Sequence, residues 1–152
     1  MFRRPTSLAA IAALAILAAL MALPHPVRAA QEDHRAIAGL VQRFVTCFNS
    51  RDVNGILDMY APDARISESG VFSKKWLSVE EYAPKLRDKL DKYDQRRAYI
   101  VDWSIKDLDV NGDSADLDIE VRAKQGPFSA RKNGSFGLAK SGQGWKIVVD
   151  ES

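Results

Sequence analysis

The chain has 152 residues, of which 46% are hydrophobic and 28% are charged, and this is enough for one globular domain with a single core. The 22 Lys and Arg side chains nearly balance the 20 Asp and Glu side chains, which excludes the strong basic excess of a nucleic-acid-binding domain. A single cysteine excludes an intrachain disulfide.

The first 29 residues have the pattern of an export signal. Arg3 and Arg4 precede an unbroken apolar run over residues 8–23, which Pro24 and Pro26 end. Small residues at Val27 and Ala29 favour cleavage after Ala29. We therefore expect residues 1–29 to be a cleaved signal peptide, residues 30–152 to be the domain, and the mature protein to be periplasmic or secreted. A retained membrane anchor is the alternative, although the run is shorter than the roughly 20 apolar residues of a membrane span.

Removing the leader would take three basic residues and leave 19 against 20 acidic ones, so the mature chain carries a net charge of about −1. We expect no nucleic-acid partner, and no membrane association once the leader is gone. Cys47 lies beside the apolar side of the first predicted helix and is expected to be a semi-buried, inert thiol. An intermolecular bridge or a nucleophile is the alternative, but no base for a nucleophile is evident.

Two amphipathic helices open the domain. Residues 32–50 repeat apolar side chains at steps of three and four, which places one apolar stripe along a helix: Ile37, Leu40, Val41, Phe44, Val45 and Phe48. Asp52 can cap a second helix with Val53, Ile56, Leu57 and Tyr60 on its apolar side, and Pro62 is expected to end it. A short strand over residues 64–67 follows, and Val71 and Phe72 can continue it after a Ser69-Gly70 turn.

A third helix is predicted to begin at Ser78, because Ser78 and Glu81 have the spacing of a capping box. Its apolar side consists of Tyr82, Leu86, Leu90 and Tyr93. Pro84 removes one backbone donor within this helix, which indicates a bend or a late start.

Four strands are predicted after Gln95. Residues 99–110 are followed by Asn111-Gly112, in which both positions can take positive φ in a tight turn. Residues 115–123 then alternate between apolar and charged side chains, and strands over residues 128–140 and 145–149 complete the pattern. Helices followed by an antiparallel meander predict an α+β domain. The outward charges of the alternating strand, Asp116, Asp118, Glu120 and Arg122, are expected to meet water or basic residues such as Arg131 and Lys132.

The order of these elements resembles the nuclear transport factor 2-like superfamily, which includes ketosteroid isomerases and polyketide cyclase-like proteins. The resemblance lies in the segments FNSRD, NGILDMY, APDARI, LSVEEY and GWKIV, and it spans the predicted mature chain. It implies a curved antiparallel sheet wrapped as a cone around the long first helix, with two further short helices. It also implies an apolar cavity and a homodimer formed through the sheet.

One site residue follows from this resemblance. In the isomerases a carboxylate shortly after the strand entry moves a proton, and YAPDARISE places Glu68 there as a tentative general base. A solvated loop carboxylate is the alternative. The isomerases also use a tyrosine on the first helix to hold the developing oxyanion, and the matching residue here is Phe44. Phenylalanine donates no hydrogen bond, which argues against isomerase chemistry of that type.

Other constellations of catalytic or metal-binding residues are incomplete. His34 is the only histidine after the leader and is expected at the surface, so a zinc site and a Ser/His/Asp triad both lack members. Asp109, Asn111, Asp113 and Glu120 have the spacing of a calcium loop, but Ser114 replaces its glycine and a strand follows in place of a helix. We therefore expect no metal and no cofactor.

The aromatic side chains can either line a cavity or fill the core, and core packing also accounts for Phe136 and Trp145. The candidate ligand contacts are Phe44, Tyr60, Trp76, Tyr82, Tyr99 and Trp103. The leading hypothesis is an exported protein that binds a small apolar molecule or a protein partner. The alternatives are an isomerase, dehydratase or cyclase that uses Glu68 as its base, and a purely structural dimer.

Overall fold

The computed structural model describes residues 25–69 and 74–151. Residues from His34 onward form one compact unit, and residues up to Asp33 belong to a separate one. Most of the predicted leader lies outside the described residues. Within the described ranges no helix is both long enough and apolar enough to span a membrane.

The first described helix, α2 (His25–Ser50), begins seven residues before the predicted start at Glu32. The predicted apolar stripe is confirmed: Ile37, Val41 and Val45 are buried, and the other three residues of the stripe are half-buried. From His34 onward this stripe supplies one wall of the core.

The second helix, α3 (Val53–Leu57), is shorter than predicted. Asp52 caps it as expected, because its Oδ1 accepts a hydrogen bond from the Gly55 N–H at 2.8 Å. Tyr60 and Pro62 were predicted to lie on and to end this helix, but both belong to strand β1 (Tyr60–Ser69). The Ile147 N–H donates to the Met59 carbonyl at 2.8 Å, so pairing with the last strand draws this segment into the sheet. Pro62 falls where the pairing register shifts, a place where a missing N–H costs little.

The predicted continuation at Val71 and Phe72 lies outside the described residues. Strand β2 (Lys74–Leu77) pairs antiparallel with β1 and leads into α4 (Val79–Gln95). The capping box between Ser78 and Glu81 is confirmed. Pro84 lies within α4, which shows no late start, and Leu86 and Leu90 are buried as predicted.

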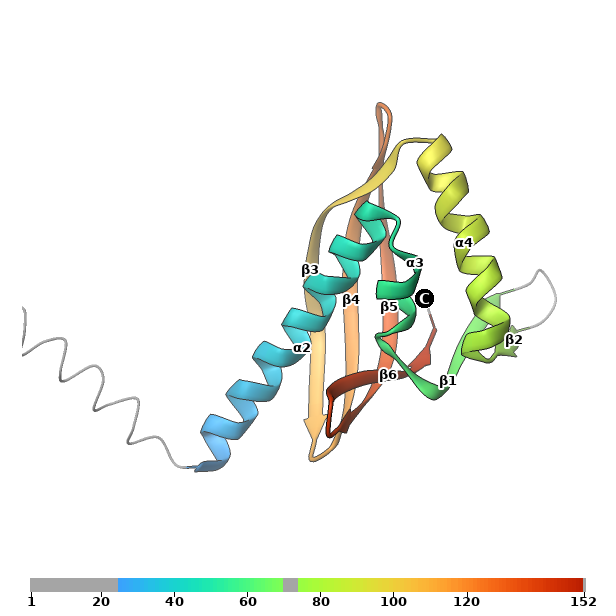
Figure 1. Cartoon of the computed structure of the whole chain (residues 1–152). Coiled ribbons are helices and arrows are strands. Elements are labelled where there is room, and N and C mark those ends of the chain that lie inside the picture. The colour runs from blue at the N-terminus through green and yellow to red at the C-terminus, as the bar shows by residue number, and fades with distance from the viewer. Residues whose placement is uncertain (1–24, 70–73, 152) are drawn as a thin grey trace, which may run out of the picture. The chain divides into compact units, whose positions relative to one another are not determined.

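The four predicted strands of the meander are present as β3 (Ala98–Asn111), β4 (Ser114–Gln125), β5 (Phe128–Ser141) and β6 (Gly144–Asp150). The sheet has the order β2-β1-β6-β5-β4-β3 (Figure 1). It is not wholly antiparallel as predicted, since β1 and β6 run parallel. The β3–β4 turn is centred on Gly112 and Asp113, and only Gly112 has a positive φ, of 61°.

The curved sheet and the helices form the α+β architecture predicted from the sequence. The inward side chains of β4 are buried at Ala115, Leu117 and Ile119, and they share one core with the stripe of α2. Cys47 is also buried, with 8% of its surface exposed, which is deeper than the semi-buried position predicted for it. Its Sγ lies 3.9 Å from the Asp52 carboxylate.

The outer face of β3–β5 is charged. Glu120 forms ion pairs with Lys106 at 3.2 Å and with Arg131 at 3.8 Å, in agreement with the prediction for Arg131. Lys132 does not join them, because it stands opposite the inward Val121. Four exposed aspartates lie directly opposite one another in two cross-strand pairs near the β3–β4 turn: Asp107 with Asp118, and Asp109 with Asp116.

Candidate functional site

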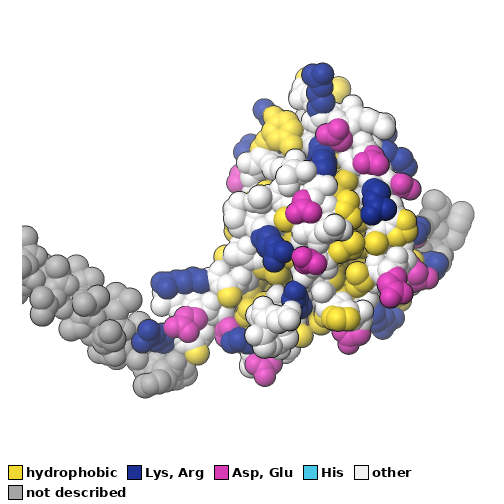
Figure 2. Space-filling view, viewed as in Figure 1, with side chains coloured by type: hydrophobic (Ala, Val, Ile, Leu, Met, Phe, Trp, Pro, Cys, Tyr) yellow, Lys and Arg dark blue, Asp and Glu magenta, His cyan; other side chains and the backbone are white. Residues whose placement is uncertain are grey.

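Two clefts open beside α4. The aromatic cleft, of about 320 Å³, lies between the ends of α2 and α4 and the inner face of β3–β5. The polar cleft, of about 480 Å³, lies between α4 and the strands β1, β2 and β6. Lys89 of α4 lines both. Figure 2 shows apolar side chains reaching the surface along this side of the molecule, with charged groups around them.

The aromatic cleft is walled by rings from three elements. Phe44 and Phe48 lie one turn apart on α2, with ring centroids 6.4 Å apart and nearly parallel planes. Phe136 of β5 lies 6.4 Å from Phe44, and Tyr93 of α4 lies 5.5 Å from Phe48. These separations are typical of aromatic packing, and the remaining ring surface faces the cleft. The other apolar lining residues come from the sheet: Ala98, Ile100, Ile119, Val121, Ala123, Phe128 and Ala130.

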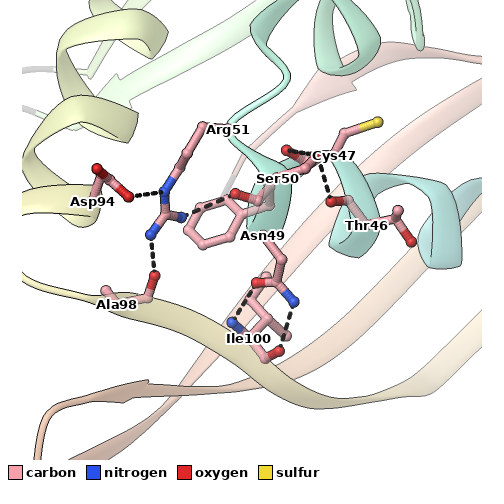
Figure 3. Close-up of polar contacts among 9 residues, drawn as sticks. Thr46, Cys47, Asn49, Ser50, Arg51, Asp94, Ala98 and Ile100 are labelled. Carbon is pink, nitrogen blue, oxygen red and sulfur yellow. Dashed lines mark hydrogen bonds and ion pairs between the residues drawn. The ribbon is translucent and has the colours of Figure 1, made fainter.

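A polar clamp at the end of α2 fixes one end of this cleft (Figure 3). The Asn49 side chain donates to the Ile100 carbonyl at 2.9 Å and accepts from the Ile100 N–H at 2.8 Å. Arg51 donates to the carbonyls of Ala98 and Phe48, and its Nε lies 3.5 Å from the Asp94 carboxylate. The clamp therefore joins the end of α2, the end of α4 and the start of β3.

Arg51 has a left-handed backbone, with a φ of 61°, and this conformation ends α2 and turns the chain into α3. Gly55 of α3 then packs against Asp52 and Cys47 so closely that a Cβ atom would lie 2.3 Å from Asp52 Oδ2 and 2.7 Å from Cys47 Sγ. The segment FNSRD thus positions the aromatic wall through its backbone as well as through its side chains.

Positive charge surrounds the aromatic cleft. Lys89, Lys124 and Lys132 line it, and among its described lining residues there is no Asp or Glu. Within the described part of the chain, none of these three lysines forms an ion pair. The other polar lining residues are uncharged: Gln125, Ser129 and Asn133.

Glu68, the predicted base, lines the polar cleft. Both of its carboxylate oxygens accept hydrogen bonds from Lys85 Nζ, at 2.7 and 2.9 Å, and 44% of its side-chain surface is exposed. This half-exposed ion pair differs from the desolvated carboxylate that the resemblance implied. Phe44, at the position of the missing oxyanion donor, lines the aromatic cleft instead.

A buried carboxylate lies at the base of the polar cleft. Asp150 is 2% exposed, and it accepts a hydrogen bond of 2.5 Å from the Tyr60 hydroxyl. Burial, reinforced by the Asp150 charge, raises the pKa of Tyr60 well above its ordinary value of 10.0. The same two causes raise the pKa of Tyr82, whose ring centroid lies 6.0 Å from that of Tyr60. Both hydroxyls therefore remain protonated hydrogen-bonding groups at neutral pH.

Of the six predicted ligand contacts, Phe44 lines the aromatic cleft and Tyr82 lines the polar one, while Tyr60 is buried beside Tyr82. The other three lie outside both clefts. Trp76 packs under the Arg65 guanidinium at 4.6 Å, Trp103 donates to Gln42 Oε1 at 3.1 Å, and Tyr99 is exposed.

The described residues do not form the zinc or calcium sites that the sequence brought into question. His34 is exposed, as predicted. The candidate calcium residues lie on a β-hairpin in which Glu120 is paired with Lys106, so an EF-hand reading of this segment is wrong. No group of three or more His, Cys, Asp or Glu side chains in the described ranges is placed to hold a metal ion.

Several residues of the clefts were not singled out by the sequence. Lys132 was assigned to the outer face, although the inward positions of β5 alternate and include Ala130, Gly134, Phe136 and Leu138, which would have placed it inward. Asn49 and Arg51 lie in the segment FNSRD, which indicated the end of the first helix but not their hydrogen bonds to other elements. Asp150 had no signal, because a break in the register of β6 turns it inward.

Solved structures with the same fold support this architecture at low sequence identity. A protein with a cystatin-like fold from Novosphingobium aromaticivorans is 15% identical, with a TM-score of 0.62, and the match covers 97% of this chain and 89% of that one. A protein of unknown function from Pseudomonas putida KT2440 is 17% identical, with a TM-score of 0.63 and coverages of 80% and 84%. Both are described as nuclear transport factor 2-like.

A domain of unknown function from Nostoc punctiforme, also with a cystatin-like fold, has a TM-score of 0.63, 15% identity and coverages of 78% and 75%. None of the curated proteins compared with the chain matches it. A family model described as "Putative lumazine-binding" matches residues 32–150, which include all the elements from α3 to β6 and most of α2. The chain therefore belongs to this lumazine-binding-like family, and it shares its fold with solved structures described as nuclear transport factor 2-like.

Proposed function

We propose that this protein is a binding protein whose aromatic cleft holds a small, flat, apolar molecule. The observation that carries the proposal is the cleft itself, in which Phe44, Phe48 and Phe136 turn ring surface toward an open space of about 320 Å³. A concave apolar site with a few polar groups at its edge is the usual form of a small-molecule site. The family description supports a small flat ligand, because lumazine is a flat bicyclic heteroaromatic molecule, although its carbonyl and N–H groups make it more polar than a hydrocarbon ring system.

The side chains at the candidate catalytic positions favour binding over catalysis. Phe44 supplies no hydrogen-bond donor, and Glu68 is held in a half-exposed ion pair with Lys85 outside the aromatic cleft. Cys47 is buried against Asp52 and does not line either cleft. A pocket without an activated nucleophile or base can still bind a ligand tightly through apolar contact.

Filling the cleft should weaken binding of the ligand. Ala130 is an exposed lining residue, so Ala130→Phe adds a ring to the cleft without hollowing the core. The fluorescence of N-phenyl-1-naphthylamine, a neutral flat probe, should rise with wild-type protein, and the affinity should fall at least about tenfold in the variant. This loss corresponds to about 1.4 kcal/mol.

A matched control places the same ring elsewhere. Ser104→Phe adds a phenyl group on the outer face of β3, opposite Glu120, and should leave the affinity unchanged. A titration with lumazine tests whether the cleft also binds the molecule named in the family description. Absence of binding by both compounds, or equal binding by wild type and Ala130→Phe, would contradict the proposal.

We also propose that the protein is exported and that it acts as a homodimer. The export signal in residues 1–29 supports the first part, and the compact unit that begins at His34 would stay intact after cleavage. Charge segregation on the outer face of β3–β5 supports the second. One end carries the four facing aspartates. The other carries Arg122 and Arg131, which pair with Asp102 and Glu120 but stay at least half exposed, so a twofold axis can still bring the aspartates to them.

A further inference from the structure

Three lysines approach the aromatic cleft from different parts of the fold. Lys89 comes from α4, Lys124 from the end of β4, and Lys132 from β5. Lys132 and Val121 are directly opposite across β4 and β5, so the lysine extends from the same inner face as the apolar floor. Positive charge therefore borders the apolar surface on both the helix side and the sheet side.

These charges are not neutralised within the described residues. Glu120, the neighbour of Val121, projects to the outer face and is already paired with Lys106 and Arg131. Lys85, on the same helix as Lys89, is paired with Glu68 in the polar cleft. Lys85 and Lys106 thus each have a carboxylate partner, and the three lysines at the aromatic cleft have none among the described residues.

We propose that the ligand of the aromatic cleft is an organic anion with a flat apolar body. The inference rests on the proposed function and adds the charge of the ligand to it. Apolar surface of the ligand would lie against Phe44, Phe48 and Phe136, and its carboxylate, sulfonate or phosphate would lie at the edge within reach of the lysines. An anion at the border of an apolar cleft is attracted more strongly than one in bulk water, because the local dielectric is lower.

Two fluorescent probes separate the charge from the apolar body. 8-Anilinonaphthalene-1-sulfonate and N-phenyl-1-naphthylamine share the anilinonaphthalene body, and only the first carries a sulfonate. The anionic probe should bind at least about tenfold more tightly at low salt. Raising the salt from 0.05 to 1 M shortens the Debye length to about 3 Å, so it should weaken the anionic probe and leave the neutral one unchanged.

Removing the lysines should remove this preference. Each of Lys89→Gln, Lys124→Gln and Lys132→Gln should weaken the anionic probe about two- to fivefold, the range of a solvent-exposed ion pair. The triple variant should bind both probes with equal affinity. The control triple variant Arg35→Gln, Lys75→Gln and Arg87→Gln loses the same charge from exposed positions that do not line the aromatic cleft, and it should keep the preference. Circular dichroism confirms that each variant is folded, because unfolded or loosely packed chains also bind the anionic probe.

The outcomes distinguish this inference from the function on which it rests. Equal affinities of the two probes for wild-type protein would overturn the anion proposal and leave the apolar site standing. An equal loss in the control triple variant would assign the preference to net charge and would also overturn it. If neither probe bound, or if Ala130→Phe bound both like wild type, the proposed function itself would fail.

Discussion

Asp150 is a charged side chain that folding removes almost completely from water. The hydrogen bond from Tyr60 helps to offset this loss of hydration, because desolvation of a carboxylate costs on the order of several kcal/mol. Tyr60 is itself buried at the start of β1. The pair thus joins the first residue of β1 to the last residue of β6 by a side-chain bond.

Replacing Tyr60 with Phe should lower the free energy of unfolding by about 1–3 kcal/mol, because the carboxylate loses a buried donor. Urea denaturation at pH 7 measures this change. Tyr99→Phe removes a hydroxyl from an exposed ring and should have no effect, which makes it the matched control. Wild-type stability in Tyr60→Phe would show that the hydrogen bond contributes little.

The same variant should change the dependence of stability on pH. A tyrosine whose folded pKa is raised keeps its proton after the unfolded chain has released it, so its contribution is complete below pH 10.0 and is lost as the pH rises through the folded pKa. Phenylalanine cannot ionise. The difference in stability between wild type and variant should therefore narrow above pH 10, and a constant difference would contradict the assignment.

The candidate residues show what sequence can and cannot establish about single side chains. The resemblance implied that Glu68 lies at the mouth of an apolar cavity, whereas the structure places it in the polar cleft. Its ion pair with Lys85 depends on a tertiary contact between β1 and α4 that no local sequence pattern indicates. Trp76 and Trp103 were chosen because large aromatic residues often line cavities. Each instead packs or bonds locally, with Arg65 and with Gln42.

At the scale of elements, periodicity predicted α2, α4 and the four strands of the meander, because each has a continuous apolar face. The errors concern segments whose structure is set by a distant partner. Tyr60 and Pro62 fit the helical spacing, yet pairing of β1 with β6 places them in a strand. The break in register between Gly137 and Leu138 sets Asp150 opposite Phe136, where a regular strand would place Val149. A one-residue shift exchanges the faces of a strand, so alternation assigns Asp150 to the wrong side.

The facing aspartates of β3 and β4 yield a prediction at this scale. Asp107 and Asp118 form one of these like-charged pairs. Asp118→Lys turns it into a pair of opposite charges and should raise the stability of the monomer by about 0.2–1 kcal/mol. It should also weaken the proposed dimer, because the acidic end would no longer match the basic end of the second copy. Urea denaturation of dilute protein and light scattering over a range of concentrations measure the two effects.

Asp63→Lys makes the same change of charge on an exposed position of β1 and serves as the control. We expect Asp118→Lys to increase the stability of the monomer and to weaken the dimer, and we expect neither change in Asp63→Lys. An unchanged dissociation constant would place the dimer interface elsewhere, and a monomeric wild-type protein at all concentrations would remove the dimer proposal.

For the whole molecule, the order of elements was sufficient to predict an α+β fold of the nuclear transport factor 2-like kind. Two clefts lie beside α4, and the sequence could not reveal that Lys89 lines both of them. Cleft walls come from segments up to about ninety positions apart, as with Phe44 and Phe136. Such a surface forms only when distant segments pack together. Composition and spacing therefore predict the helices and strands that contribute to it, but not which side chains meet in the cleft.

The export proposal is tested on the complete chain. Expressed with its own N-terminus in a bacterial host that has a periplasm, the protein should appear in the periplasmic fraction, and its intact mass should correspond to a chain that begins at Ala30. Replacing Ala29 with Asp should block cleavage, because the signal peptidase requires a small residue there. Recovery of uncleaved wild-type protein from the cytoplasm would refute export.

The parallel pairing of β1 with β6 also determines when the domain can finish folding. The strands β3 to β6 can form in succession from neighbouring segments, but β1 must wait for residues 144–150, which include its partners Ile147 and Asp150. The sheet therefore stays in two pieces during synthesis until those residues have left the ribosome, and contacts of such sequence separation form slowly. In a chain exported as proposed above, this delay would leave the polypeptide unfolded while the export machinery engages it.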